Sequence, residues 1–365
     1  MGFFFRISFC LLLAIQSICN ANVEKRASIV IDYNSKKVLF AGHPDEKRYP
    51  ASLTKIMTIY LLLEAIKAKK ITPNTKFKTS KFASQQIPSK LGLKVGEKIS
   101  VLNIMKALTV KSANDAAVVA AEGLAGTVKN FCVLMNRKAK QLGMKNTHFE
   151  NPAGTPNPKQ KSTAMDLVKL GMATYRDFPQ YWKLFSEKTF LHKGKQCNTH
   201  CKILLWYKWA DGAKTGYIND SGFNLFVTAR RSKNGSEKRI FVVVMGEKSG
   251  KIRDLRAARL MDQYLGNCDV SPKQPKLESA KKSLMAQVGK SEMLDQLVHE
   301  EESILVSNVV KSSNVTADYL ADLYQVDDEI IEAEEELLVK QVKKTAKKLM
   351  DGKNLKKRKS RSRRK

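Results

Sequence analysis

The chain has 365 residues, of which 43% are hydrophobic, so it can bury a sizeable core in one large domain or in two. This hydrophobic share is ordinary for a globular protein and argues against a chain that is disordered throughout. The 65 Lys and Arg residues outnumber the 35 Asp and Glu residues, and the formal net charge of +30 favours a polyanionic partner.

The first residues have the pattern of a secretory signal. Arg6 precedes an apolar run, residues 7–18, which is too short for a stable anchor and is followed by the small residue Ala21. We predict a signal peptide over residues 1–21, cleaved after Ala21; an uncleaved anchor is the alternative. Lipoprotein cleavage before Cys19 is disfavoured, because the preceding residues lack the necessary small-residue pattern. No later segment is apolar enough to cross a bilayer.

The predicted signal places the protein in the periplasm or cell envelope, with peripheral attachment to the inner membrane as a further hypothesis. The compartment changes how the positive charge is interpreted. Nucleic acid is not an expected partner there, whereas an anionic membrane surface or an acidic envelope polymer fits. Disulfides can also persist in such a compartment.

After cleavage the chain would retain Cys132, Cys197, Cys201 and Cys268. Cys197 and Cys201 are close enough in sequence to form a disulfide, but the spacing leaves the pairing open. With His192 and His200 they could also be drawn as a zinc site, although this spacing matches no standard ligand pattern. We therefore expect no metal site and favour a disulfide or free thiols.

The region after the signal begins with strand-like residues and continues with helical patterns. Residues 27–33 and 37–41 predict a β-hairpin around Asn34-Ser35. Apolar residues at helical spacing predict a helix from about Ser52 to Lys69. Further helical stretches are expected within 101–125 with a break around Ser112, over about 127–142, and from a capping segment at Ser162–Asp166 through Tyr175.

After Gly212 the pattern changes to strands. Strand-like runs cover 213–217, 223–230 and 239–246, with a turn at Asn234-Gly235, and a final helix covers about 252–265. Strands at both ends with helices between them predict an α+β fold, in which an antiparallel sheet is flanked by helices and a helical subdomain. We assign this domain to residues 22–268.

The remainder of the chain differs in composition. Residues 269–291 carry Pro272 and Pro275 among lysines and serines, which is typical of a linker. Residues 292–350 predict a helical C-terminal extension with an apolar stripe, and residues 351–365 a basic, disordered tail. The tail could bind anionic lipid, where each Lys or Arg contributes about 1 kcal/mol. Alternatively the helix self-associates or binds a partner through its stripe, or the charges are simply solvated.

Ser52-Leu53-Thr54-Lys55 places a hydroxyl and an amine one helical turn apart at the start of a predicted helix. A serine hydroxyl is a weak nucleophile and needs an adjacent base. Lys55 could be that base if burial or a second cation lowers its pKa from about 10.4. Alone, such a pair is more often a capping serine followed by a surface lysine.

Ser112-Ala113-Asn114 is predicted to lie in a loop between two helices. Ser112 could pass a proton to a leaving amine, and Asn114 could hold a substrate backbone or Lys55. The same pattern is also common in turns, so it indicates little alone.

Lys214-Thr215-Gly216 is predicted to begin a strand. The Lys214 ammonium and the Thr215 hydroxyl could together bind a substrate carboxylate, and Gly216 would let a ligand approach the backbone. The peptide N–H groups of Ser52 and Tyr217 could form an oxyanion hole. An edge strand with a solvated lysine is the alternative.

None of the three motifs is specific, because similar patterns recur at Ser279/Lys282, Ser232/Asn234 and Ser312/Asn314. The order of the first set is the informative feature. Helices separate its motifs and two strands follow it, which together predict acyl transfer through a serine ester.

Over about residues 26–267 the chain resembles the serine D-alanyl-D-alanine carboxypeptidases, the low-molecular-weight penicillin-binding proteins. The matching segments are Tyr49–Thr58, Ser112–Ala117, Asn151–Gly154, Ser162–Leu167 and Asp211–Tyr217. The resemblance implies the penicillin-binding/β-lactamase-like transpeptidase fold and a role in peptidoglycan metabolism of the cell wall.

The resemblance also implies roles for the matched positions. The implied catalytic residues are Ser52 as the acylated nucleophile, Lys55 as its base, and Ser112 and Asn114 as aids to proton transfer and binding. The implied substrate-binding residues are Lys214, Thr215, Gly216 and Tyr217. The substrate would be the D-Ala-D-Ala end of a peptidoglycan stem peptide, β-lactams would inhibit, and no metal or organic cofactor is implied.

Three features depart from the family pattern. Thr155 stands where many relatives have leucine, which would adjust a loop and not the chemistry. The stretch Cys197–Cys201 carries unusual cysteines, so local substrate preference stays open. The region beyond residue 268 does not resemble the β-rich second domain of many relatives.

Three other functions compete with the carboxypeptidase. A serine β-lactamase needs fast deacylation, served in one class by an added glutamate, and no Glu-x-x-Leu-Asn stretch lies between the second and third motifs. A D,D-endopeptidase is not distinguished by sequence. A non-enzymatic envelope scaffold is disfavoured, since such a protein need not keep Ser52, Lys55 and Lys214 together.

Overall fold

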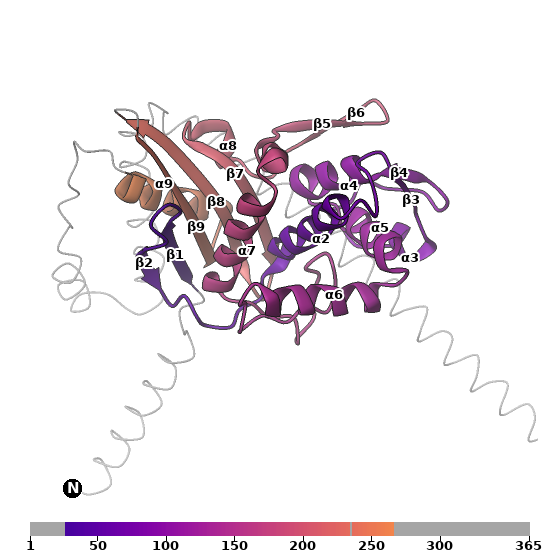
Figure 1. Ribbon diagram of the computed structural model, residues 1–365, viewed down its shortest axis with the longest axis horizontal. Coiled ribbons are helices and arrows are strands. Elements are labelled where there is room, and N and C mark those ends of the chain that lie inside the picture. The colour runs from indigo at the N-terminus through magenta and orange to yellow at the C-terminus, as the bar shows by residue number, and fades with distance from the viewer. Residues whose placement is uncertain (1–25, 234–235, 266–365) are drawn as a thin grey trace, which may run out of the picture.

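A five-stranded antiparallel sheet organises the part of the chain that the computed structural model describes, residues 26–233 and 236–265. The strand order is β2-β1-β9-β8-β7, so the first strands of the chain lie beside the last (Figure 1). The bounds are β1 Ala27–Asp32, β2 Val38–Gly42, β7 Ala210–Ile218, β8 Gly222–Lys233 and β9 Ser236–Glu247. The predicted α+β class with an antiparallel sheet is confirmed.

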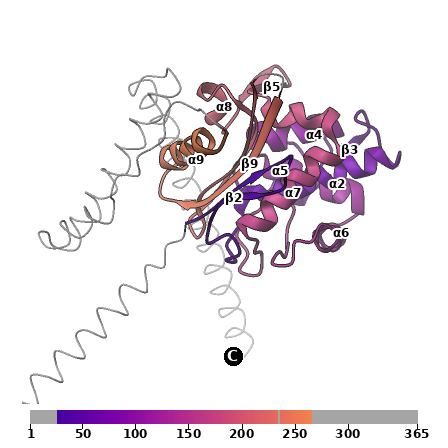
Figure 2. The ribbon, with the colours of Figure 1, turned by 60° about the vertical axis from the view of Figure 1, so that its left-hand side comes forward.

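Strand β1 shows why the sheet has a core on each face. All six of its residues are buried, because the strand is paired on both edges and covered on both faces. Ile29 packs into the core on the helical side, whereas Val30 packs into a second core beneath α9 (Gly250–Leu265). Figure 2 shows α9 on one face of the sheet and α7 (Ala164–Asp177) on the other.

The helices between β2 and β7 form the helical subdomain and the layer that covers the sheet. Besides α7, their bounds are η1 Ala51–Thr54, α2 Lys55–Lys67, α3 Lys81–Ser84, α4 Val101–Lys106, η2 Ala107–Lys111, α5 Asn114–Ala125, α6 Val128–Gln141, η3 Pro179–Ser186 and α8 Ile203–Trp206. Helix α2 lies at the centre and is buried nearly all round. Its sequence is therefore apolar on every side, unlike that of a surface helix.

Two short two-stranded sheets lie apart from the main sheet, and only the second is a hairpin. β3 (Lys76–Lys78) pairs with β4 (Lys98–Ser100), and β5 (Thr189–His192) pairs with β6 (Lys195–Asn198). The sequence did not predict these strands, nor α3, η3 and α8, because elements of three to eight residues are too short to establish a periodicity.

Side-chain caps fix the ends of the longer helices. Thr127 Oγ1 accepts the N–H of Asn130 at 3.1 Å at the start of α6, and Thr163 Oγ1 accepts the N–H of Asp166 at 3.1 Å at the start of α7. These bonds satisfy N–H groups that have no partner within the helix. The predicted capping segment before α7 is thus confirmed, with Thr163 as the capping residue.

Near the site, one predicted boundary is confirmed with a different helix type and another is wrong. The helix near Ser52 begins as the 3-10 turn η1, and the α-helix starts only at Lys55. Strand β7 begins at Ala210, so Lys214 lies in the middle of the strand and not at its beginning. The strand can continue through the charged Asp211 because an ion pair with Arg239, at 2.6 Å, neutralises it.

The predicted signal peptide, linker, helical extension and basic tail (residues 1–21, 269–291, 292–350 and 351–365) lie outside the described residues, as does Cys268. Within the described part, no single helix has the length and apolar character to span a membrane. Only the pair α5 and α6 meets that criterion together, by length and composition alone, across a bend of 86°.

Gly171 in α7 tests the fit between this helix and the sheet. An added Cβ would overlap the ring of Phe226 on β8, so we expect Gly171→Ala to lower the free energy of unfolding by about 1–3 kcal/mol. The control is Gly250→Ala in α9, where the nearest atom to the new Cβ is 3.7 Å away. Denaturant unfolding should show a loss for the first variant only; equal stability of both would contradict the packing described.

Candidate active site

Ser52 and Lys55 meet because the chain makes a tight turn before α2. In a 3-10 turn, side chains three residues apart lie directly above one another. Ser52 belongs to η1 and Lys55 follows it, and Lys55 Nζ lies 2.8 Å from Ser52 Oγ. Lys55 is fully buried, whereas Ser52 is half-buried. The hydroxyl is therefore reachable and the amine is shielded from water.

The turn that carries Ser52 is held from behind by the loop at residues 151–154. Ala51 has a left-handed backbone with φ of 46°, and Gly154, with φ of 86°, packs against its carbonyl so closely that a Cβ would overlap it. Asn151 Oδ1 accepts the N–H of Gly154 at 2.7 Å and fixes this loop. A glycine is thus required beside the nucleophile turn.

Three oxygens surround the Lys55 amine. Besides Ser52 Oγ, Nζ lies 2.8 Å from Asn114 Oδ1 and 2.6 Å from the Ala153 carbonyl oxygen. A neutral amine has two N–H groups and one lone pair. The amide and carbonyl oxygens can only accept, so they take the two N–H groups. The lone pair is then left for the Ser52 hydroxyl, as a general base requires.

The electrostatics of this position favour the neutral amine. Burial, and next the positive charge of Lys214, hold the pKa of Lys55 well below its ordinary value, while Asp115 opposes the shift. Asp115 is itself engaged, because its carboxylate accepts the N–H groups of Gly92 and Leu93 at 2.9 and 3.1 Å.

Ser112 and Asn114 are brought to the site by an irregular helix junction. The π-helical turn η2 ends at Ser112, which has a left-handed backbone with φ of 58°, and α5 starts at Asn114. Asn114 Nδ2 donates to the carbonyls of Ile87 and Pro88, both at 3.0 Å. These bonds fix the amide orientation and turn Oδ1 toward Lys55.

Lys214 approaches from strand β7 on the sheet side. It is fully buried, and its Nζ donates to Ser112 Oγ at 3.0 Å and to the Thr215 carbonyl at 2.8 Å. Burial lowers the pKa of Lys214 to about 8, with Arg253 acting in the same direction and Cys201 against it. Lys214 thus stays charged near neutral pH, although less firmly than an exposed lysine.

Strand β7 runs directly against the nucleophile turn. A Cβ at Gly216 would lie 2.9 Å from the Ser52 nitrogen, so no larger residue fits without displacement. Thr215 is buried, whereas Tyr217 is half-buried and its ring lies 4.3 Å from that of Phe223. The structure thus links six predicted site residues, Ser52, Lys55, Ser112, Asn114, Lys214 and Gly216, and places Thr215 and Tyr217 beside Gly216 on β7.

Sequence reasoning missed the backbone and supporting groups of this site. The Ala153 carbonyl contacts Lys55, but a backbone oxygen leaves no residue signature. Asn224 on β8 donates to the Tyr49 carbonyl at 3.0 Å and accepts the Gly246 N–H at 3.0 Å, which ties the segment before η1 to the sheet. Only the loop containing Ala153 had been noted, as part of the segment Asn151–Gly154.

Cys201 is buried in the second core beside strand β7, and of the two states left open for the cysteines the free thiol holds. Cys197 and Cys201 are both free thiols, and Cys201 Sγ lies 4.0 Å from Thr215 Oγ1. Burial raises the pKa of the Cys201 thiol, and Lys214 opposes this.

Burial and the charges of Lys111 and Lys214 lower the pKa of His200 to about 3, although its side chain is only half-buried.

Across the described ranges, no three His, Cys, Asp or Glu side chains are grouped as a metal would require. The zinc site drawn from His192, Cys197, His200 and Cys201 is therefore not assembled.

Comparison with known proteins identifies the relatives of this chain. The family model described as D-alanyl-D-alanine carboxypeptidase matches residues 15–249. The chain is 38% identical over 251 residues to the D-alanyl-D-alanine carboxypeptidase DacA of Haemophilus influenzae, covering 67% of this chain and 63% of that protein. The chain thus spans less than two thirds of that relative.

Two solved structures extend the comparison. Penicillin-binding protein 5 from Haemophilus influenzae superposes with a TM-score of 0.62 at 35% identity, covering 64% of this chain and 69% of that one. Penicillin-binding protein D2 from Listeria monocytogenes, in its ampicillin-bound form, gives a TM-score of 0.58 at 27% identity, covering 64% of this chain and 94% of that one. The penicillin-binding type of fold is therefore confirmed.

Asn114→Asp tests the environment of the buried amine. A carboxylate 2.8 Å from Lys55 Nζ would favour the ammonium, so we expect the variant to raise the pKa of Lys55. Asn157→Asp adds the same charge at a half-buried loop position, where the side chain accepts the N–H of Lys159 instead of contacting the Lys55 amine, and should leave that pKa unchanged. Side-chain NMR titration of the lysines measures both; an unchanged Lys55 titration in Asn114→Asp would show that the amide does not contact the amine.

Proposed function

The chain belongs to the D-alanyl-D-alanine carboxypeptidase family, and from this we propose that it is a serine-type D-Ala-D-Ala carboxypeptidase acting on peptidoglycan stem peptides. The observation that carries the proposal is the buried Lys55 amine, 2.8 Å from Ser52 Oγ, with two further oxygens to accept its N–H groups. This arrangement supplies a neutral base to a reachable hydroxyl, which is what acyl transfer through serine requires.

In the proposed acylation, Ser52 Oγ attacks the carbonyl carbon of the penultimate D-alanine while its proton passes to Lys55 Nζ. The N–H groups of Ser52 and Tyr217 hold the oxyanion of the tetrahedral intermediate. The loss of one such donor typically costs about 2.7–4 kcal/mol of transition-state stabilisation. Collapse breaks the peptide C–N bond, and the leaving amine takes the proton from Lys55 by way of Ser112. Water then releases the acyl group by the same route in reverse.

The substrate's terminal carboxylate would bind at β7. Lys214 uses two N–H groups on Ser112 and on the Thr215 carbonyl, so its third can donate to a carboxylate oxygen. The Thr215 hydroxyl would donate to the same group, and Gly216 leaves room for the substrate backbone beside the Ser52 turn. Asn114 would position Lys55 and contact the substrate backbone. Each step uses side chains or peptide groups of this chain, so the reaction needs no cofactor.

The proposal also covers location and organisation. We propose a catalytic domain over residues 22–268, exported by the signal at residues 1–21 to the periplasm or cell envelope. The basic tail, residues 351–365, would contact anionic inner-membrane lipid. The ampicillin-bound form of the Listeria relative supports the expectation that β-lactams acylate Ser52.

Labelled penicillin tests the nucleophile. The intact chain should form a long-lived adduct on Ser52 that mass spectrometry locates, and Ser52→Ala should abolish it and lower kcat/KM on a D-Ala-D-Ala peptide by at least about 1,000-fold. Ser232→Ala, at the similar Ser-x-Asn sequence on β8, is the control and should behave as the parent. Rapid turnover of penicillin without an adduct would identify a β-lactamase instead.

The pH dependence of kcat/KM tests the two lysines separately. Activity should rise with pH as Lys55 loses its proton, at a pKa well below 10.5, and should fall above about pH 8 as Lys214 loses the charge that binds the carboxylate. Lys214→Arg keeps its charge at all these pH values. The kcat/KM of this variant should therefore not decrease above pH 8, even if its absolute value is lower than that of the parent. An alkaline fall that persists in this variant would exclude Lys214 as its source.

A further inference from the structure

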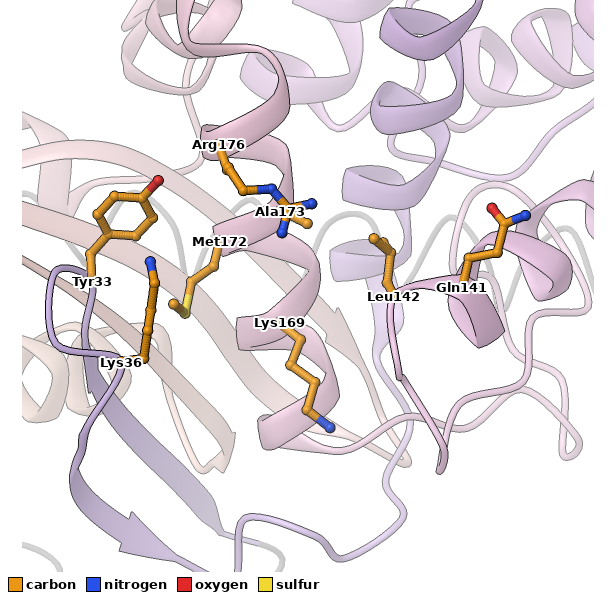
Figure 3. A pocket seen from close by; sticks show the side chains of 8 residues that line it. All are labelled: Tyr33, Lys36, Gln141, Leu142, Lys169, Met172, Ala173 and Arg176. Atoms are coloured by element: carbon orange, nitrogen blue, oxygen red, sulfur yellow. The ribbon is translucent and has the colours of Figure 1, made fainter.

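A second, cationic pocket lies on the outer side of α7, with no residue in common with the site around Ser52. Its volume is about 310 Å³, and the lining residues are Tyr33, Lys36, Gln141, Leu142, Lys169, Met172, Ala173 and Arg176. Figure 3 shows Tyr33 and Lys36 from the β1–β2 turn facing the side chains of α7, with Leu142 and Gln141 beyond them. Cations and a phenol thus surround an apolar floor.

Lys36 is held at the mouth of this pocket by its turn. Its backbone has a φ of 61°, and its N–H donates to the Asp32 carbonyl at 2.9 Å. The Nζ lies 3.6 Å from the centre of the Tyr33 ring, and that ring packs edge-on against Tyr175 at 5.0 Å. Within the described part of the chain, the Lys36 ammonium has no hydrogen-bond or ion-pair acceptor besides this ring contact, and the residue is exposed, so donors remain for a ligand.

The other two cations, Lys169 and Arg176, are oriented by hydrogen bonds that leave some of their N–H groups available. Lys169 Nζ donates to the Gly143 carbonyl at 3.0 Å and to Asp166 Oδ1 at 3.1 Å. Arg176 donates through Nε and Nη2 to Asp177 at 2.7 and 2.8 Å. Each of these two cations is thus paired with an acid, although the pocket lining itself contains no Asp or Glu.

The ion pairs with Asp177 and Asp166 offset the charges of Arg176 and Lys169, whereas the nearest acid to Lys36, Asp32, is bonded within its own turn. Asp32 Oδ1 accepts the N–H of Ser35 at 2.8 Å, and Asp177 Oδ2 accepts the Tyr60 hydroxyl at 2.7 Å. Burial, and next the charge of Arg176, lower the pKa of Lys36, while Asp32 opposes the shift. The lysine and the arginine therefore repel each other, and a bound anion would remove this repulsion.

We propose that this pocket binds a carboxylate of a peptidoglycan stem peptide, as a docking site apart from the active site. The pocket volume is at the lower end for small-molecule sites, which suits one acidic residue of a polymer and not a whole strand. The floor of Leu142 and Met172 would contact its methylene groups. The choice of this polymer rests on the proposed function, whereas the anion preference rests on the pocket alone.

The charge of the surrounding domain favours a polymeric anion. Residues 26–265 contain 43 Lys and Arg against 17 Asp and Glu, so most of the excess positive charge lies here and not in the C-terminal tail. Such an excess attracts any polyanion but does not select a contact point. A concave site that presents the Lys36 ammonium provides that selection, and a flat lipid surface would not enter it.

The test compares two adjacent lysines on the same turn. Lys36→Gln and Lys37→Gln remove the same charge, and Lys37 is exposed and does not line the pocket. The full chain is co-sedimented with purified sacculi whose stem peptides have been trimmed to tripeptides, so that no D-alanine end can occupy the active site. Lys36→Gln should weaken binding about fivefold, the effect of one partly exposed ion pair, and Lys37→Gln less than twofold.

Equal effects of the two variants would overturn the proposal, since the binding would then follow net charge only. The proposal would also fail if Lys36→Gln weakened binding to phosphatidylglycerol vesicles but not to sacculi. Activity on a short D-Ala-D-Ala peptide is measured for each variant and should equal that of the parent. An inactive parent would refute the proposed function, whereas the sacculus comparison would still decide whether the pocket binds an acidic peptide.

Discussion

The buried amine of Lys55 is the group on which the site depends. An isolated ammonium without water is very costly, so a lysine at the start of a buried helix must either lose its proton or be surrounded by acceptors. Here acceptors surround the Lys55 amine, and burial lowers its pKa. Its acceptors come from three separate segments, the η1 turn, the start of α5 and the loop at residues 151–154, so the amine position requires the helical subdomain to be assembled.

Two fully buried lysines with different protonation would explain how one site both abstracts a proton and binds an acid. Lys55 faces a carbonyl, an amide oxygen and a hydroxyl, and carries the repulsion of Lys214. Lys214 keeps a pKa of about 8 and is linked through Ser112 to the η2–α5 junction. The environments push the two pKa values apart, which is how a site assigns a base and a cation to the same residue type. Through its bond to Lys214, Ser112 joins the strand to the helical side.

The sequence predicted those features of the fold and the site that depend on side chains close together along the chain. The i, i+3 pair Ser52/Lys55, the cap before α7 and the apolar runs of β1, β8 and β9 were all predictable, because each is a local pattern. The Ala153 carbonyl was not, since its role depends on a left-handed glycine at 154 packing against Ala51, far away in sequence. The start of β7 was also missed, because Asp is depleted in strands and the long-range partner of Asp211, Arg239, cannot be recognised from the sequence. The pairing of β3 with β4, which α3 separates along the chain, depends on tertiary contacts in the same way.

The large positive charge of the domain affects the binding of anionic polymers and not the pKa of the base, Lys55. Charges separated by more than about 8–10 Å are screened at physiological ionic strength, so exposed lysines have little effect on a buried amine. The cations that lower the pKa of Lys55 and of Lys214 are buried ones, Lys214 and Arg253 respectively. A polymer with many carboxylates, by contrast, interacts with many exposed lysines and arginines simultaneously, so all of these charges contribute to its attraction. The exposed charge can therefore vary in position without changing the chemistry, whereas the distance between Lys55 and Lys214 cannot.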